Sequence, residues 1–165
     1  MLGQSSEPEP VIDVHAHAMP MPLLLWLADR GLADVSRADV EVVRLDSRVS
    51  GVGCGVPLPL ARSQHDVCVR LAEMDAVGVS HHAVSLPPFL FCSTADDGDL
   101  VADVVARGNE ELAAYVAGDR DRLVALGSVP LGWPGAAAQA RRCLDELRSA
   151  SSPGPRLSWC YSSTR

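Results

Sequence analysis

Lysine is missing from this chain, and all fourteen of its basic residues are arginines. Without a lysine amine, the chain cannot form a Schiff base with a carbonyl substrate or use a lysine nucleophile. Acidic residues number 21, which gives a formal net charge of −7. Because this charge repels polyphosphate and the sequence has no basic cluster, we expect no nucleic-acid partner.

Long apolar runs and a secretory leader are also missing. The most apolar stretch, residues 21–28, contains a proline and is too short to span a bilayer. The first ten residues are polar and acidic and lack the positive region of a signal peptide. Five cysteines are scattered without a C-x-x-C pair, which favours reduced thiols. We therefore expect a cytoplasmic protein with no membrane partner.

The most informative stretch is VIDVHAHAMP, residues 11–20. The apolar residues at positions 11, 12 and 14 predict a short buried β-strand, and His15 and His17 lie where it ends. Because side chains alternate along an extended backbone, we expect both imidazoles on one side and Ala16 on the other. Two neutral imidazoles side by side supply half of a divalent metal site. Two ordinary histidines near a surface turn are the alternative.

The rest of the chain alternates between helical and strand-like patterns. Apolar residues at helical spacing predict a short helix after Pro22 and long helices over 63–77, 99–116 and 134–147. Strands are expected at 82–85 and 123–129, the latter buried on both faces. Residues 40–45 have strand character, but the Gly- and Pro-rich stretch 47–59 follows them. Between the first strand and the first long helix, segment 33–61 is therefore expected to be an irregular insertion or a small hairpin.

The resulting order, βαβαβα, predicts an α/β fold with parallel strands and right-handed crossovers. A doubly wound sheet and a barrel that stops after its first βα units both fit this order. No glycine-rich phosphate-binding motif follows the first strand, which disfavours a nucleotide site.

The pattern stops after Arg148. Residues 149–165 are rich in serine and proline and contain no apolar strand within the usual length of an αβ loop. We predict that 1–148 is one unit and that 149–165 is a disordered tail of foreign origin.

Three blocks of the sequence together resemble the amidohydrolase-related superfamily, in particular its amidohydrolase 2 group. They are IDVHAHAMP, RLAEMDAVGVSHHAVSLPP and RLVALGSVPL, and their order and spacing look most like the aminocarboxymuconate-semialdehyde decarboxylase branch. Asn109 and Arg122 also fall where that group carries such residues. The resemblance covers roughly residues 11–147.

The resemblance implies a (β/α)8 TIM barrel of the metal-dependent hydrolase type. Such a barrel needs about 250 residues, so this chain supplies about its first three βα units. The resemblance also implies a divalent metal, usually zinc, with His15 and His17 as the first ligands and further ligands on strands that this chain lacks. The implied reaction is non-oxidative decarboxylation of an unsaturated or aromatic carboxylic acid, a small-molecule substrate. A homodimer is a further expectation.

Two other functions stay open at this point. A metal-dependent hydrolase of the same superfamily would use the same first ligands, and a truncated product without activity would retain them unused. No catalytic acid or base can be identified from the sequence. Three arginines of the insertion can clamp a carboxylate, although a solvated surface role fits them better: Arg44, Arg48 and Arg62. Capping or structural roles are expected for His65, His81 and His82. Candidate pocket-lining residues are Ser85 and Pro88.

Overall fold

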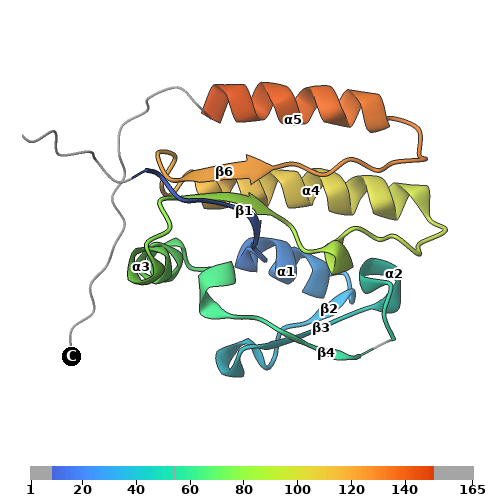
Figure 1. Ribbon diagram of the computed structural model, residues 1–165. Helices are drawn as coiled ribbons and strands as arrows, with labels where there is room; N and C mark the ends of the chain where they lie inside the picture. The colour runs from blue at the N-terminus through green and yellow to red at the C-terminus, as the bar shows by residue number, and fades with distance from the viewer. Residues whose placement is uncertain (1–8, 54, 151–165) are drawn as a thin grey trace, which may run out of the picture.

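The computed structural model describes residues 9–53 and 55–150, with side chains described up to residue 145 (Figure 1). The α-helices are α1 (Met21–Ala28), α2 (Ser47–Ser50), α3 (Val67–Val77), α4 (Gly98–Val116) and α5 (Ala136–Ala150). The strands are β1 (Ile12–His17), β2 (Ala33–Asp34), β3 (Val42–Leu45), β4 (Pro57–Pro59), β5 (His81–Ser85) and β6 (Leu123–Leu126). Short 3-10 helices are η1 (Ala38–Val40), η2 (Arg62–Gln64) and η3 (Pro88–Leu90).

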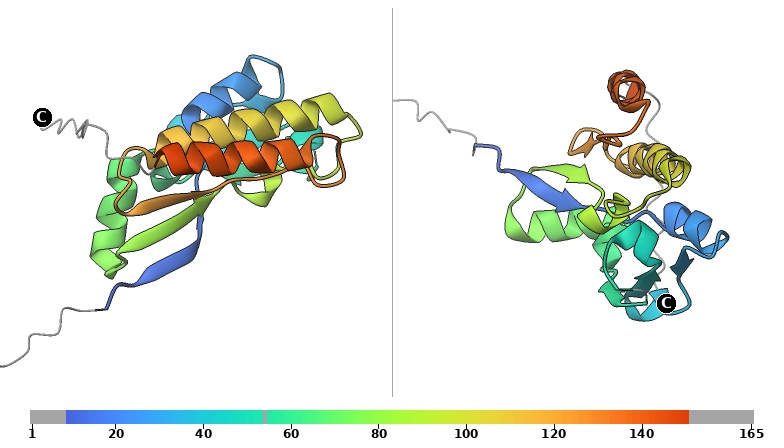
Figure 2. Two further views of the ribbon diagram at one scale, coloured as in Figure 1. Left: turned by 90° about the horizontal axis from the view of Figure 1, so that it is seen from above. Right: turned by 90° about the vertical axis from the view of Figure 1, so that its right-hand side faces the viewer.

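A parallel sheet in the order β1-β5-β6 forms the centre of the molecule. Because parallel neighbours need a crossover, α3 connects β1 to β5 and α4 connects β5 to β6. Figure 2 shows α4 and α5 running side by side along one side of this sheet. The predicted βαβαβα order is confirmed. Within the described residues the sheet is not closed, and β1 and β6 are its edges.

Only one face of the parallel sheet is covered by described residues. On the covered face Val84, Leu123 and Ala125 are buried, and α4 packs against β5 and β6. On the other face, which we call the open face, Val124 and Leu126 are 54% and 43% exposed. The prediction that the third strand is buried on both faces is therefore wrong. In a closed barrel the open face would point into the packed interior, which explains its apolar residues.

The first strand also differs from its prediction. Its apolar residues were expected to be buried, but Val11, Ile12 and Val14 are 53%, 59% and 72% exposed. The reason is that β1 is an edge strand, and no described element covers its outer side. Sequence alone cannot show this, because an apolar strand reads the same whether or not its neighbours are present.

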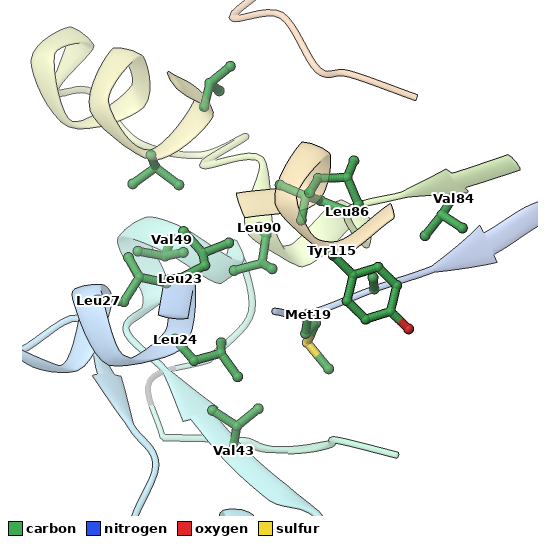
Figure 3. Packing of buried hydrophobic residues seen from close by; sticks show 14 of the residues in the cluster. Met19, Leu23, Leu24, Leu27, Val43, Val49, Val84, Leu86, Leu90 and Tyr115 are labelled. Carbon is green, nitrogen blue, oxygen red and sulfur yellow. The ribbon is translucent and has the colours of Figure 1, made fainter. Parts of the chain in front are cut away.

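The segment 33–61 is not an irregular insertion, and of the two expected alternatives it is closer to the small hairpin, with a third strand added. It contains the antiparallel sheet β2-β3-β4, in which Ala33 is opposite Leu45 and Val43 is opposite Leu58. The buried side chains of this segment pack under α1, and Figure 3 shows Val43 near Leu24 of that helix. Pro57 and Pro59, which argue against a regular element in the sequence, lie in β4. Because β4 is an edge strand, the backbone N–H that each proline lacks is not needed for pairing on its outer side.

Helix boundaries follow their capping residues. The first long helix, α3, begins at Val67 rather than at Ser63, because the Asp66 side chain accepts the backbone N–H groups of residues 68 and 69. Residues 62–64 form η2 instead. Helix α3 ends at Gly78, whose φ of 73° is the left-handed conformation that glycine adopts easily. No helix in the described part of the chain is long and apolar enough to cross a membrane. Of the predicted tail, 151–165 lies outside the described residues.

Candidate functional site

The imidazoles of His15 and His17 lie beside each other at the C-terminal end of β1. Their ring centroids are 5.0 Å apart, and the ring planes are inclined at 81°. Ala16, between them, is buried. The pairing of β1 with β5 shifts register between Asp13 and Ala16, which marks a bulge in β1. Bulges commonly re-aim side chains next to active sites.

Hydrogen bonds to Ser85 and Gln64 hold the His17 ring and the backbone that follows it. The His17 ring shares a 3.0 Å hydrogen bond between its Nδ1 and the Ser85 Oγ. The Ala18 N–H donates to the Ser85 carbonyl over 2.9 Å, and the Met19 N–H donates to the Gln64 carbonyl over 2.8 Å. By strand register, His17, Ser85 and Leu126 form a row across the sheet on its open face. Ser85, a predicted pocket residue, therefore contacts a predicted ligand.

His15 is fixed less tightly. Its backbone N–H donates to the Asp13 Oδ1 over 2.8 Å, and the residue is exposed. The other Asp13 oxygen, Oδ2, lies 3.5 Å from the Nε2 of His82. Asp13 thus connects the bulge of β1 to the side chain of the neighbouring strand.

His82 faces away from the open face and packs against α3. Its Nδ1 lies 3.0 Å from the Nη1 of Arg70, and since a guanidinium only donates, this Nδ1 must accept. The ring proton is then on Nε2, toward Asp13. Burial lowers the pKa of His82 below its ordinary value, and the nearby charge of Arg70 lowers it further, against the opposing effect of Asp13. These are the contacts of a structural residue, as expected for His82.

Arg70 of α3 is a residue that sequence reasoning missed. It is only 5% exposed, and its guanidinium donates to acceptors on four segments of the chain. These acceptors are the His17 carbonyl, the Ser63 carbonyl, the Tyr115 hydroxyl and the His82 ring. The available signal was an arginine inside the apolar stripe of a helix, between the expected core positions 67 and 74.

The other predicted candidates contact partners other than the histidine pair. Each arginine of the insertion pairs with a nearby aspartate: Arg44 with Asp34 at 3.9 Å, Arg48 with Asp46 at 2.8 Å, and Arg62 with Asp66 at 4.0 Å. These pairings fit the expected surface role. The His65 N–H donates to the Arg62 carbonyl at the end of η2. His81 contacts the Ser80 hydroxyl. Pro88 is the exposed first residue of η3.

The loop after β6, at the same end of the sheet as His17, is held by Asn109 of α4. The Asn109 side chain accepts the Ser128 N–H and donates to the Ser128 carbonyl, both over 2.8 Å. Asn109 is buried, and it gives this loop the hydrogen-bond partners that no strand among the described residues supplies. The residue that the family resemblance singled out is thus a structural clamp on the loop.

The imidazoles of His15 and His17 are the candidate metal ligands among the described residues. No group of three or more histidine, cysteine, aspartate or glutamate side chains is arranged to hold a metal within residues 9–53 and 55–145. A catalytic zinc usually has three protein ligands and one open position. The pair therefore fits half of such a site. The buried Cys92 adds no reactive thiolate, because burial raises its pKa to about 11.

No family model matches the chain. Solved structures do match it. A protein from Staphylococcus aureus assigned as an amidohydrolase is 15% identical, with a TM-score of 0.55 over 85% of this chain and 35% of its own. The 5-carboxyvanillate decarboxylase from Sphingomonas paucimobilis is 23% identical, with a TM-score of 0.53 over 84% and 40%.

A third match is a dihydroxybenzoic acid decarboxylase from Polaromonas sp. JS666, solved with manganese and the inhibitor 2-nitroresorcinol. It is 23% identical, with a TM-score of 0.52 over 86% of this chain and 36% of its own. The chain thus spans 35% to 40% of the length of the structures it matches. With its unclosed parallel sheet β1-β5-β6, it has the α/β fold of the N-terminal part of the TIM-barrel amidohydrolases.

Proposed function

We propose that His15 and His17 are two ligands of a divalent metal ion, zinc or manganese, at the C-terminal end of β1. The observation that carries this proposal is the adjacency of the two rings, 5.0 Å apart between centroids. A metal-bound histidine typically donates its other ring N–H to a neighbouring acceptor, which fixes the tautomer. The Ser85 Oγ, 3.0 Å from the His17 Nδ1, is placed to accept that proton and leave Nε2 as the ligand.

The reaction we propose for the complete site is non-oxidative decarboxylation of an unsaturated or aromatic carboxylic acid. Two of the matched structures are decarboxylases whose names specify aromatic acids, and the sequence blocks resemble the same branch. When bound, a divalent ion supplies Lewis acidity toward a carboxylate or a neighbouring oxygen of the substrate. The contribution of this chain is to hold two ligands and to orient one of them through Ser85.

Hydrolysis is the second candidate, because the Staphylococcus aureus match is assigned as an amidohydrolase. The same ligand pair serves both reactions, so the substrate test must include amides and esters beside carboxylic acids. In either case the described residues provide two ligands where active sites use three or more. We therefore expect the 165-residue chain to bind zinc only weakly.

The ligand assignment is tested by titrating zinc and manganese into the chain with isotopically labelled histidines. Zinc should shift the ring nitrogens of His15 and His17, and manganese should broaden their signals. His15→Ala and His17→Ala should each raise the zinc Kd about ten-fold or more. The matched control is His81→Ala, at the opposite end of β5, which should leave the Kd within about two-fold. Zinc affinity unchanged in both ligand variants would contradict the assignment.

The reaction is tested by joining residues 1–147 to the C-terminal part of the 5-carboxyvanillate decarboxylase barrel. This fusion should release carbon dioxide from aromatic carboxylates in a metal-dependent manner, and His15→Ala within it should abolish that release. A metal-loaded fusion that hydrolyses amides or esters and releases no carbon dioxide would favour the hydrolase instead.

A further inference from the structure

We propose that Arg70 is a positioning residue, which sets the geometry of His17 by holding the carbonyl group of that histidine. This inference rests on the proposed metal ligation by His15 and His17. It assigns to Arg70 a role in metal affinity that goes beyond stabilising the fold.

The first step of the argument is that Arg70 is a costly choice at a buried position. Burying a guanidinium is unfavourable unless its charge is paired, and an apolar side chain of similar volume is often at least as stable. No aspartate or glutamate among the described residues lies within ion-pair distance of Arg70. Its partners are neutral acceptors. Net stability alone therefore explains this arginine poorly.

The second step is that the acceptors of Arg70 belong to four segments that meet near the C-terminal end of β1. The Nη2 donates to the His17 carbonyl, at the end of β1, and the Nη1 donates to His82 of β5. The Nε lies 2.8 Å from the Tyr115 hydroxyl of α4 and 3.1 Å from the Ser63 carbonyl before α3. A rigid planar fork with five N–H donors can reach four such acceptors, and a lysine cannot. Arg70 thus fixes the end of β1 relative to three other elements.

The third step concerns the peptide group between His17 and Ala18. Its carbonyl accepts from Arg70, and its N–H donates to the Ser85 carbonyl. Holding both polar groups of a peptide fixes the backbone torsion of His17, and with it the direction in which the imidazole leaves the chain. Ser85 then fixes the ring itself through its hydroxyl. Without Arg70, this peptide would be held at its N–H alone, so the His17 torsion would be less tightly fixed.

The experiment compares Arg70→Met and Arg70→Lys with Arg122→Met. Arg122 is a matched control because it is a half-buried arginine that donates to the Ser80 and Val79 carbonyls, at the opposite end of β5. Ring-nitrogen NMR spectra of the labelled histidines are recorded without metal and during a zinc titration. Urea unfolding is measured for each variant in parallel.

We expect R70M to change the His17 ring-nitrogen shifts without metal and to raise the zinc Kd about ten-fold or more, as loss of an outer partner of a metal ligand does. R70K should recover part of the affinity. R122M should lose folding stability while leaving the His17 shifts unchanged and the zinc Kd within about two-fold. A purely structural Arg70 would behave as Arg122 does, and that result would overturn the inference.

If R70M does not fold, the unsubstituted chain and R70K decide the question. The Nε–H signal of Arg70 should shift during the zinc titration while that of Arg122 stays in place, and its failure to move while His17 responds overturns the inference. If zinc leaves His15 and His17 of the unsubstituted chain unchanged, the proposed metal site fails. The metal-free His17 shifts of R70K then still decide whether Arg70 positions that ring.

Discussion

Gly108 in α4 is a helix-interior glycine whose replacement by alanine should destabilise the protein, contrary to helix propensity. A Cβ at this position would lie 2.5 Å from the Cδ1 of Leu86, which is completely buried just after β5. Alanine is better than glycine inside a helix by about 1 kcal/mol, whereas overpacking a core costs about 1–3 kcal/mol. Since Leu86 cannot turn into solvent, we expect Gly108→Ala to lower the free energy of unfolding by about 1 kcal/mol.

The assay is urea unfolding of four chains: unsubstituted, Gly108→Ala, Leu86→Val and the double variant. Leu86→Val removes the methyl group that the new Cβ would meet and by itself should cost about 1 kcal/mol. In that background Gly108→Ala should become neutral or stabilising by up to about 1 kcal/mol, because only the propensity gain remains. The coupling energy between the two positions is then about 1–2 kcal/mol, within the range for residues in contact.

A G108A chain that is more stable than the unsubstituted chain would refute the packing argument. A coupling energy near zero would do the same, because it would place the effect of alanine in the helix alone. The test bears on the site because Leu86 directly follows Ser85, so the close approach of α4 at Gly108 determines where the end of β5 lies.

Three further predictions concern pH, association and activity. The pKa of His82 is lower in the folded chain than its ordinary value of 6.5, so below pH 6.5 the unfolded chain binds more protons than the folded one. The free energy of unfolding should therefore be highest above that pH and should fall as the pH drops below it. His82→Asn, which keeps an acceptor for Arg70, should flatten this slope in urea unfolding measured across that range. The open face should cause concentration-dependent self-association in sedimentation experiments, and Val124→Glu should weaken it while Val77→Glu on the exposed side of α3 should not. The 165-residue chain with zinc should release no carbon dioxide from aromatic carboxylates, and turnover abolished by His15→Ala would contradict this.

The order of elements could be predicted because each helix and strand carries its own local pattern. The apolar stripe of α4 is buried as its spacing indicated, with Val101, Val104 and Leu112 all in the core. Gly78 ends α3 for the reason that a glycine can adopt a positive φ. The start of α3 was misplaced because Ser63 and Asp66 are both good capping residues, and only the backbone geometry decides between them.

The features that could not be predicted depend on contacts between residues far apart in the sequence, which a local pattern does not reveal. The exposure of Val14 follows from the position of β1 at a sheet edge, which no strand reveals by its own composition. The small sheet within 33–61 is stabilised by packing against α1. Its strands are short and one of them contains two prolines, so the sequence pattern does not identify them as strands. Arg70 is the most instructive miss, because its contacts join residues that are 7 to 53 positions away in the sequence.

The two histidines of the candidate site are therefore not equivalent. His17 is held through its ring by Ser85 and through its carbonyl by Arg70, and both partners lie within the described residues. His15 is exposed and is held at its N–H by Asp13, a neighbour in the same bulge. Preorganised ligands contribute more to metal affinity than mobile ones, because less ordering remains to be done on binding. If the pair binds a metal ion as proposed, His17 should then set the position of the ion, with His15 adjusting to it.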